Sequence, residues 1–237
     1  MEQTVIAKKL NDCGCRVAEQ EPLAAHTTFH IGGAAAFFVT AETAEPVTAV
    51  QRLCREEALP LLVIGNGSNL LVSDNGFDGV VLRLSPRETA IKGCLVRAAA
   101  GTSLTKLCND VCEAGLSGLE FAFGIPGTVG GAVFMNAGAY GGQLSDVLRR
   151  VTAVTPSGEV VTMEADALAL GYRHSIFMEN GYTVVEAEFE LRPSDPHNIR
   201  AAMADYMMRR RDKQPLEYPS AGSFFKRPEG YFAGALI

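Results

Sequence analysis

Glycine is concentrated in residues 121–142, FAFGIPGTVGGAVFMNAGAYGG, more densely than in an ordinary core segment. Seven glycines, from Gly124 to Gly142, fall within 19 residues of this stretch. A glycine has no side chain and accepts positive φ at a cost in folding entropy, so such a cluster lets the backbone lie close to another group. Bare N–H groups suit a phosphate-bearing ligand. Tight turns between strands are the structural alternative for the same glycines.

Composition limits the partners that the chain can bind. Its 237 residues, 47% of them hydrophobic, can fill one large domain or two smaller ones. The formal net charge of −6 disfavours nucleic acid and anionic membranes, so an anionic ligand needs a local basic cluster. The N-terminus lacks a signal-peptide pattern, and no apolar run approaches the roughly 18 residues of a membrane span. We therefore expect a cytoplasmic protein.

The six cysteines and four histidines predict no metal site. A chain of this length without a secretion signal is expected to keep its thiols reduced and mostly buried. Cys108 and Cys112 lie four residues apart in a helical pattern and belong on its core face. Cys13 and Cys15 are followed by no second ligand pair, and the histidines form no HExxH motif.

The first third of the chain predicts a strand, a helix and a second strand, at residues 34–41, 46–58 and 61–64. Such a unit favours a parallel pair of strands. Residues 70–84 then predict a strand, a turn and a strand.

Residues 65–69, Gly-Asn-Gly-Ser-Asn, follow the second of these strands and partly match a dinucleotide-binding motif. The third glycine of GxGxxG is replaced by Leu70 and no helix follows, which argues against a Rossmann unit. The two glycines, the serine hydroxyl and the second asparagine can still wrap a pyrophosphate through a nest of N–H groups. A simple turn between strands is the alternative.

The middle of the chain predicts a strand at 94–100, a helix cap at 101–103 and a helix that ends at Ala114. A hairpin is predicted from residues 147–155 and 159–163.

Residues 183–191 alternate between apolar and acidic side chains, which predicts a half-exposed strand. Its glutamates Glu186, Glu188 and Glu190 are expected to face water. Asp195 is then the predicted N-cap of a helix that ends in the basic run 209–213.

Four motifs taken together are far more specific than any one of them. They are GNGSNLL at 65–71, GIPGTVGGAVFMNAGAYGG at 124–142, GYRHSIF at 171–177 and KQPLEYPSAGSFFKRPEGYFAG at 213–234. This set closely resembles the UDP-N-acetylenolpyruvoylglucosamine reductase family, flavoenzymes that make UDP-N-acetylmuramate for bacterial peptidoglycan. The resemblance covers essentially the whole chain.

The resemblance implies an α+β fold of the vanillyl-alcohol oxidase and p-cresol methylhydroxylase type, in which two subdomains bind FAD and a third binds substrate. It implies a first FAD-binding subdomain at 1–84, a second at 85–194 and the start of the substrate-binding domain at 195–237. Family members continue past Ile237 and deliver a glutamate to the flavin, so we expect a C-terminally truncated form whose own activity is in doubt.

The resemblance also assigns the contacts with FAD to two loops. In the first loop these are Gly65, Asn66, Gly67, Ser68, Asn69 and Leu70. In the second they are Gly124, Ile125, Pro126, Gly127, Gly130, Gly131, Asn136 and Gly138.

The implied reaction moves a hydride from NADPH through FAD to the enolpyruvyl group, and a proton follows. Arg173 matches the residue that stabilises the enolate, for which a permanently charged planar fork is well suited. Ser223 matches the proton donor, and Lys226 and Arg227 could supply the positive charge that a serine acid requires. A surface ion pair for Arg173 and a turn hydroxyl for Ser223 are the structural alternatives.

Tyr140 and Lys213 match residues that bind the UDP-sugar substrate, as Lys226 and Arg227 are also expected to do. The basic run is equally compatible with a solvated helix end, which leaves Arg209 and Arg210 open.

Two other functions remain possible on the same residues. One is an FAD-dependent oxidase or dehydrogenase of the same fold. The other is an inactive module that binds a nucleotide sugar, which the missing glutamate favours. The sequence does not identify protein partners.

Overall fold

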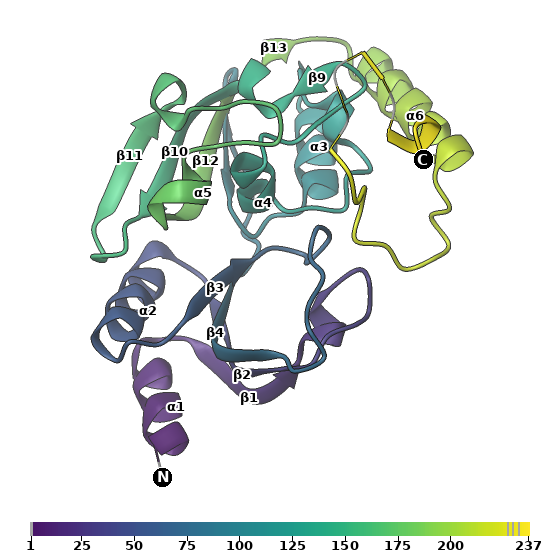
Figure 1. Ribbon diagram of the computed structural model, residues 1–237. Helices are drawn as coiled ribbons and strands as arrows, with labels where there is room; N and C mark the ends of the chain where they lie inside the picture. Colours follow the sequence, from purple (N-terminus) through teal and green to yellow (C-terminus); the bar gives the residue numbers. More distant parts are fainter. Residues whose placement is uncertain (1, 227, 229, 232) are drawn as a thin grey trace.

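Two main β-sheets, each with helices packed against it, form the body of the structure (Figure 1). The computed structural model describes residues 2–226, 228, 230–231 and 233–237. The first sheet has the strand order β1-β2-β4-β3, and the second has the order β11-β10-β12-β6-β5. This combination of helices with separate sheets confirms the predicted α+β class.

The first sheet contains β1 (Arg16–Pro22), β2 (Ala34–Ala41), β4 (Phe77–Leu84) and β3 (Leu61–Ile64). The second contains β11 (Val160–Glu164), β10 (Leu148–Val154), β12 (Thr183–Glu190), β6 (Leu95–Ala99) and β5 (Ala90–Lys92). Two short pairs join β13 (Arg192–Pro193) to β7 (Leu116–Ser117) and β8 (Gly138–Ala139) to β9 (Gly142–Gln143). The α-helices are α1 (Glu2–Asp12), α2 (Ala44–Glu56), α3 (Leu104–Glu113), α4 (Val129–Phe134), α5 (Phe177–Asn180) and α6 (Pro196–Lys213). Short 3-10 helices span Leu23–His26, Glu120–Ala122, Leu144–Asp146, Ala165–Leu168 and Ala233–Ala235.

The strands β2, β4 and β3 of the first sheet run parallel, and α2 connects β2 to β3. The predicted strand, helix and strand are therefore confirmed in type and direction, but β4 lies between the two strands and pairs with both. Both neighbours align with Leu82, through Val39 of β2 and Val63 of β3. Four consecutive residues of β4, 79–82, are buried, which is typical of a central parallel strand covered on both faces.

The strand predicted at the start of residues 70–84 is wrong, because residues 70–76 form a loop and only β4 is a strand. This loop packs its backbone directly on the chain that enters β2. Gly33 donates its N–H to the Ser73 carbonyl at 2.9 Å, and a Cβ on Gly76 would overlap the Ala34 carbonyl. The contact joins residues far apart in the sequence, so the local pattern could not reveal it.

The second sheet is antiparallel throughout, and β10 and β11 confirm the predicted hairpin. The predicted cap of α3 is also confirmed, since Ser103 Oγ accepts a hydrogen bond from the Lys106 N–H at 3.2 Å. Gly115 follows the helix with φ +69°. Cys108 and Cys112 lie on the buried face of α3, as predicted.

One hydrophobic core continues from the first sheet to the second. It joins residues of β2 and α2 to residues of β6, α3 and β12. A buried hydrogen bond of 2.7 Å crosses the same junction, from Gln51 Nε2 of α2 to Thr183 Oγ1 of β12. On the second sheet α4 packs against β12 and β6, and α6, which Asp195 caps as predicted, packs against α3. Among the described residues, no helix has both the length and the apolarity of a membrane span.

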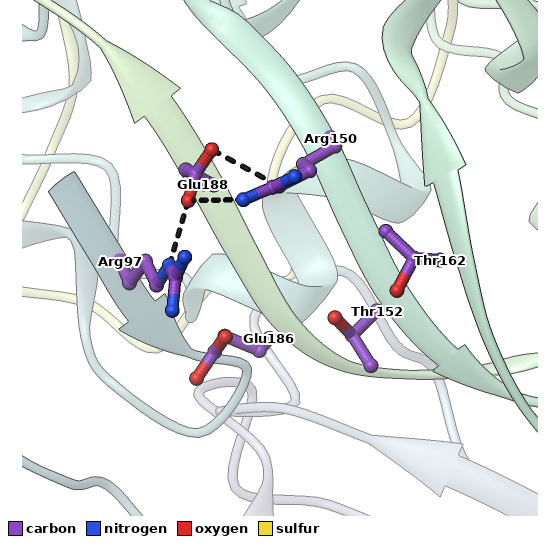
Figure 2. A pocket seen from close by; sticks show the side chains of 6 residues that line it. All are labelled: Arg97, Arg150, Thr152, Thr162, Glu186 and Glu188. Carbon is purple, nitrogen blue, oxygen red and sulfur yellow. Dashed lines mark hydrogen bonds and ion pairs between the residues drawn. The ribbon is translucent and has the colours of Figure 1, made fainter. Parts of the chain in front are cut away.

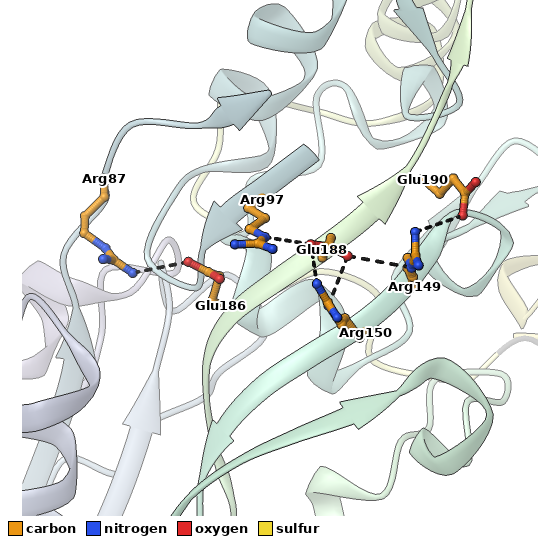
Figure 3. Close-up of polar contacts among 7 residues, drawn as sticks. All are labelled: Arg87, Arg97, Arg149, Arg150, Glu186, Glu188 and Glu190. Atoms are coloured by element: carbon orange, nitrogen blue, oxygen red, sulfur yellow. Dashed lines mark hydrogen bonds and ion pairs between the residues drawn. The ribbon is translucent and has the colours of Figure 1, made fainter. Parts of the chain in front are cut away.

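Glu188 is the exception to the predicted half-exposed strand, because only 3% of its side chain is exposed. It points to the outer face of the second sheet, where arginines from neighbouring strands cover it (Figure 3). Arg97 donates to Glu188 Oε2 at 2.6 Å and Arg150 donates to the same oxygen at 3.0 Å. Arg149 completes the cluster at 3.7 Å. The alternation of apolar and acidic residues in β12 correctly predicts the face of the sheet on which Glu188 lies, but the arginine side chains cover its carboxylate and shield it from water.

A hollow of about 250 Å³ lies beside this cluster on the same face of the sheet (Figure 2). It is lined by Arg97, Arg150, Thr152, Thr162, Glu186 and Glu188. The other two glutamates of β12 pair with arginines at 3.7 and 3.8 Å. Because these ion pairs link residues of β6 and β10 to residues of β12, we assign the cluster a role in holding the strands together.

Replacing Glu188 with glutamine is expected to make stability less dependent on pH. Burial raises the pKa of Glu188, but the hydrogen bonds from Arg97 and Arg150 outweigh burial and lower it below the ordinary value of 4.5. A lowered folded-state pKa stabilises the protein above the unfolded pKa, and this stabilisation is lost as pH falls through the folded value. The variant should lose about 1–3 kcal/mol in urea unfolding at neutral pH.

The difference between wild type and variant should shrink as the pH falls below about 4. Glu190→Gln is the matched control, because this side chain is 65% exposed and its loss should cost little. A constant difference between wild type and Glu188→Gln at every pH would contradict the explanation.

Candidate cofactor and substrate site

The two loops predicted to bind a cofactor lie against each other in the structure. We call residues 65–70 the first glycine loop and residues 124–138 the second glycine loop. Asn66 Nδ2 donates a hydrogen bond to the Pro126 carbonyl at 3.1 Å. Gly65 approaches so closely that an added Cβ would collide with Thr128 Oγ1. The glycine at position 65 therefore brings the loops together, which is more than a turn between strands requires.

Several N–H groups of these loops are free to bind a ligand. Within the described part of the chain, the amides of Asn66, Gly67, Ser68 and Asn69 donate to no other group, and neither does that of Gly127. Gly67 has φ +61°, the left-handed conformation that helps successive amides point toward one anion. The two loops therefore fit the pyrophosphate of a dinucleotide through backbone donors.

Gly130 and Gly131 differ from these residues, because their amides are already bonded. The Gly130 N–H donates to the Ala100 carbonyl at 2.8 Å, and the Gly131 N–H donates to Thr128 Oγ1 at 3.3 Å. A Cβ on Gly130 would also lie 2.8 Å from the Ala100 Cβ. Gly130 thus serves the packing of α4, contrary to the expectation that the bare N–H groups here face a phosphate. Any contact of these two residues with a cofactor stays a prediction.

The remaining residues of the predicted cofactor set lie around this contact. Leu70 is partly buried against the core of the first sheet, and Ile125 against the main core. Gly124 has φ +85° and faces α6. Gly138 lies in β8, where a Cβ would come within 2.8 Å of the Gly142 carbonyl.

Arg173 lies in residues 171–175, which are fixed to the end of the second glycine loop. Its Nη2 donates to the Gly138 carbonyl at 3.1 Å, and its guanidinium lies 5.6 Å from the ring centroid of Tyr172. Its φ of +54° is uncommon for a residue other than glycine and marks a conformation that the surroundings impose. No carboxylate among the described residues pairs with it, which excludes an ion pair with them as the reason for its position.

Asn136 holds the segment 171–175, which carries Arg173, in place. It is buried, with 2% of its surface exposed, and has φ +40°. Its Nδ2 donates to the Gly171 carbonyl at 3.0 Å and its Oδ1 accepts from the Ser145 N–H at 3.0 Å. Ser175 Oγ adds a bond of 2.7 Å to the Phe134 carbonyl. The side chain of Asn136 thus orients the segment that carries Arg173, and contact between Asn136 and a cofactor stays a prediction.

The segment that carries Ser223 lies beside the first glycine loop, and Ser223 itself is exposed. Thr28 anchors this segment, since its Oγ1 donates to the Ser220 carbonyl at 2.6 Å and its carbonyl accepts from the Ser220 N–H at 3.1 Å. A Cβ on Gly222 would lie 3.7 Å from the Ser68 carbonyl. The predicted proton donor is therefore near the predicted cofactor loop. Ser223 and Arg173, both among the described residues, form no hydrogen bond with each other.

The predicted substrate residues lie near α6 and in the last part of the chain. Tyr140 stacks on Tyr206 of α6 with ring centroids 4.8 Å apart and an interplanar angle of 4°. Lys213 is the last residue of α6, and both Lys213 and Lys226 are exposed. Arg227 lies outside the described residues. The local sequence pattern did not indicate the anchoring role of Thr28 or the stacking of Tyr206 on Tyr140, because both depend on contacts between distant segments.

Known proteins share both the sequence and the fold of this chain. A family model described as an FAD binding domain matches residues 35–164, which include both glycine loops. The UDP-N-acetylenolpyruvoylglucosamine reductase of Lachnoclostridium phytofermentans is 46% identical over 228 residues, which is 94% of this chain and 74% of the relative. That of Agathobacter rectalis is 48% identical over 233 residues, 92% of this chain and 74% of the relative.

The fold comparison agrees with the sequence comparison. The crystal structure of UDP-N-acetylenolpyruvylglucosamine reductase from Thermus caldophilus matches with a TM-score of 0.80 at 36% identity, over 94% of this chain and 78% of that chain. Glucooligosaccharide oxidase from Acremonium strictum shares the fold at 16% identity, with a TM-score of 0.56 over 79% of this chain and 42% of that chain. These matches confirm the predicted FAD-binding fold.

Proposed function

This chain belongs to the UDP-N-acetylenolpyruvoylglucosamine reductase family of FAD-dependent oxidoreductases, and we propose that it reduces UDP-N-acetylglucosamine enolpyruvate to UDP-N-acetylmuramate with NADPH. The product is a precursor of bacterial peptidoglycan. The observation that carries the proposal is the contact of two glycine loops whose free amides suit a pyrophosphate, next to an arginine that pairs with no carboxylate among the described residues. The substrate is a small UDP-sugar.

Each glycine loop has a distinct part in holding the cofactor. FAD, when bound, would carry the hydride from NADPH to the enolpyruvyl group. The free amides at 66–69 and at Gly127 would hold the pyrophosphate, and the close approach at Gly65 would keep the two sets of donors together. We place the two FAD-binding subdomains at 1–84 and 85–194 and the start of the substrate domain at 195–237.

Arg173 stabilises the negative charge that develops next to the substrate carboxylate. Its guanidinium is planar and presents parallel N–H groups that match a carboxylate. Asn136 and the Gly138 carbonyl fix the segment before the substrate arrives, so little reorganisation is needed during the reaction.

Ser223 then gives its hydroxyl proton to the carbon that has become basic. A serine hydroxyl is a weak acid, so this step needs a strongly basic acceptor and nearby positive charge. Lys226 and Arg227 follow closely in the sequence and are proposed to supply that charge, and with Tyr140 and Lys213 to bind the substrate.

The proposal is tested first by the flavin content of the purified chain and then by NADPH oxidation without oxygen. We expect bound FAD, and NADPH consumption that requires the enolpyruvyl substrate and equals the UDP-N-acetylmuramate formed. The Thermus caldophilus relative is the positive control. NADPH oxidation at a rate that does not depend on the enolpyruvyl substrate would overturn the proposal.

Two further outcomes identify the alternatives. Flavin reduction by an alcohol substrate without NADPH would indicate an oxidase or dehydrogenase. Binding of the enolpyruvyl substrate without turnover, with the relative active in the same assay, would indicate a nucleotide-sugar-binding module.

A further inference from the structure

The three consecutive arginines at the end of α6 have three different environments. Arg209 is exposed and pairs with Asp205 at 2.7 Å, and it lies 5.8 Å from the ring centroid of Tyr206. Arg211 is also exposed. Arg210 is half-buried and turns toward the second glycine loop, so the explanation as a solvated helix end fits its neighbours but not Arg210.

Arg210 contacts the first glycine of that loop. A Cβ on Gly124 would lie 3.6 Å from Arg210 Cδ, which is ordinary van der Waals contact, and 2.9 Å from Met207 Sδ, so both side chains pack against this glycine. Tyr140, which is proposed to bind substrate, is close enough to interact with the Arg210 charge. Arg210 is thus near both a cofactor loop and a residue proposed to bind substrate, and it lies on α6, the helix beside α3 (Figure 1).

The guanidinium of Arg210 has no anionic partner within the described ranges of the chain. Burial lowers its pKa from the ordinary value, which means that the surroundings disfavour the charge. A half-buried charge without a partner is costly, and buried charges in proteins are usually paired. The unpaired cation therefore indicates that an anion binds here when the site is complete.

The position favours a diphosphate as this anion. The neighbouring backbone donors carry no formal positive charge, and the whole chain has a net charge of −6, so a diphosphate needs a local cation. Lys213 lies three residues after Arg210, a spacing that places both side chains on one side of the helix. Two cations at this helical spacing would match two phosphate groups better than a single carboxylate.

We propose that Arg210 binds the diphosphate of the flavin cofactor or of the UDP-sugar, a role that rests on the proposed function. Its planar fork can give two N–H donors to the phosphate oxygens, and its contact with Gly124 places it beside the second glycine loop. Arg210 is then a binding residue distinct from Arg173, which faces the reacting end of the substrate.

The test compares Arg210→Met with Arg211→Met, which removes the same charge one residue further on. FAD and riboflavin are titrated against the flavin-free protein by flavin fluorescence, and UDP and uridine against the flavin-loaded protein by its absorbance change. We expect Arg210→Met to weaken one diphosphate ligand about 10- to 100-fold, with riboflavin and uridine unaffected. A loss for FAD assigns Arg210 to the cofactor, and a loss for UDP assigns it to the substrate.

Equal FAD and UDP affinities in Arg210→Met and Arg211→Met would overturn the inference. Failure of the wild type to bind either ligand would instead contradict the proposed function, so the two results are distinguishable. Circular dichroism checks the fold, and Arg210→Lys is the second variant if Arg210→Met does not fold. Arg210→Lys keeps the charge but loses the planar fork, so it should weaken binding of the same ligand less strongly. If a folded Arg210→Lys binds FAD and UDP with wild-type affinity, and binding does not depend on salt, the inference is also overturned.

Discussion

Replacing Arg173 with methionine is expected to slow reduction of the enolpyruvyl substrate about 10²- to 10³-fold, because the charge formed next to the substrate carboxylate loses its fixed partner. The guanidinium of Arg173 donates to the Gly138 carbonyl at 3.1 Å and pairs with no carboxylate among the described residues, and the backbone of Arg173 has a φ of +54°. The measurement is the single-turnover rate at which substrate reoxidises the protein after its reduction by NADPH.

The reduction by NADPH should be nearly unchanged in the same variant, because Arg173 acts on the substrate. Arg173→Lys should fall between wild type and Arg173→Met, since it keeps the charge but loses the planar fork. Arg192→Met is the matched control, because it removes an exposed arginine far from the loops in sequence. A wild-type reoxidation rate in Arg173→Met would leave only a structural role for this arginine.

Replacing Ser223 with alanine is expected to slow the same half-reaction by about 10²- to 10⁴-fold, because the proton donor is removed while the cofactor loops remain intact. Ser223 is exposed, and its neighbour Gly222 lies beside the Ser68 carbonyl, so the change should leave FAD affinity and thermal stability unaltered. The readouts are the reoxidation rate and its solvent deuterium isotope effect.

The isotope effect separates proton donation from a structural role. The wild type should show an effect on substrate reduction, and Ser223→Ala should change it. Ser223→Cys should recover part of the rate, because a thiol can donate a proton. If Ser223→Ala reoxidises at the wild-type rate with the same isotope effect, the hydroxyl serves only the turn in which it lies.

Local sequence signals were sufficient for most of the secondary structure. β2, α2 and β3 are defined by apolar periodicity, and the start of α3 by Ser103 and its end by Gly115. These signals depend on residues within one or two turns of each other. The sequence motifs were likewise sufficient to identify the family and the FAD-binding fold.

Features that depend on distant residues were not predictable from the local pattern. The place of β4 between β2 and β3 follows from burial on both faces, which a parallel strand acquires only from the assembled core. Glu188 appeared to face water because the alternation says nothing about three arginines from neighbouring positions on the sheet.

The candidate site shows the same division. The glycine spacing predicted two ligand loops, and their contact through Asn66 and Pro126 agrees with that prediction. The glycine spacing could not predict that the Gly130 N–H donates to the Ala100 carbonyl, because that hydrogen bond depends on how α4 packs on the end of β6. The separate environment of Arg210 likewise required the position of α6.

Hydrogen exchange of the backbone amides, with and without FAD, tests the central claim most directly. The account predicts that FAD slows exchange at residues 66–69 and at Gly127, whose amides have no acceptor among the described residues, and changes little at Gly130, whose amide is already bonded to Ala100. FAD that binds without protecting either glycine loop would contradict the account, because the cofactor would then be held elsewhere.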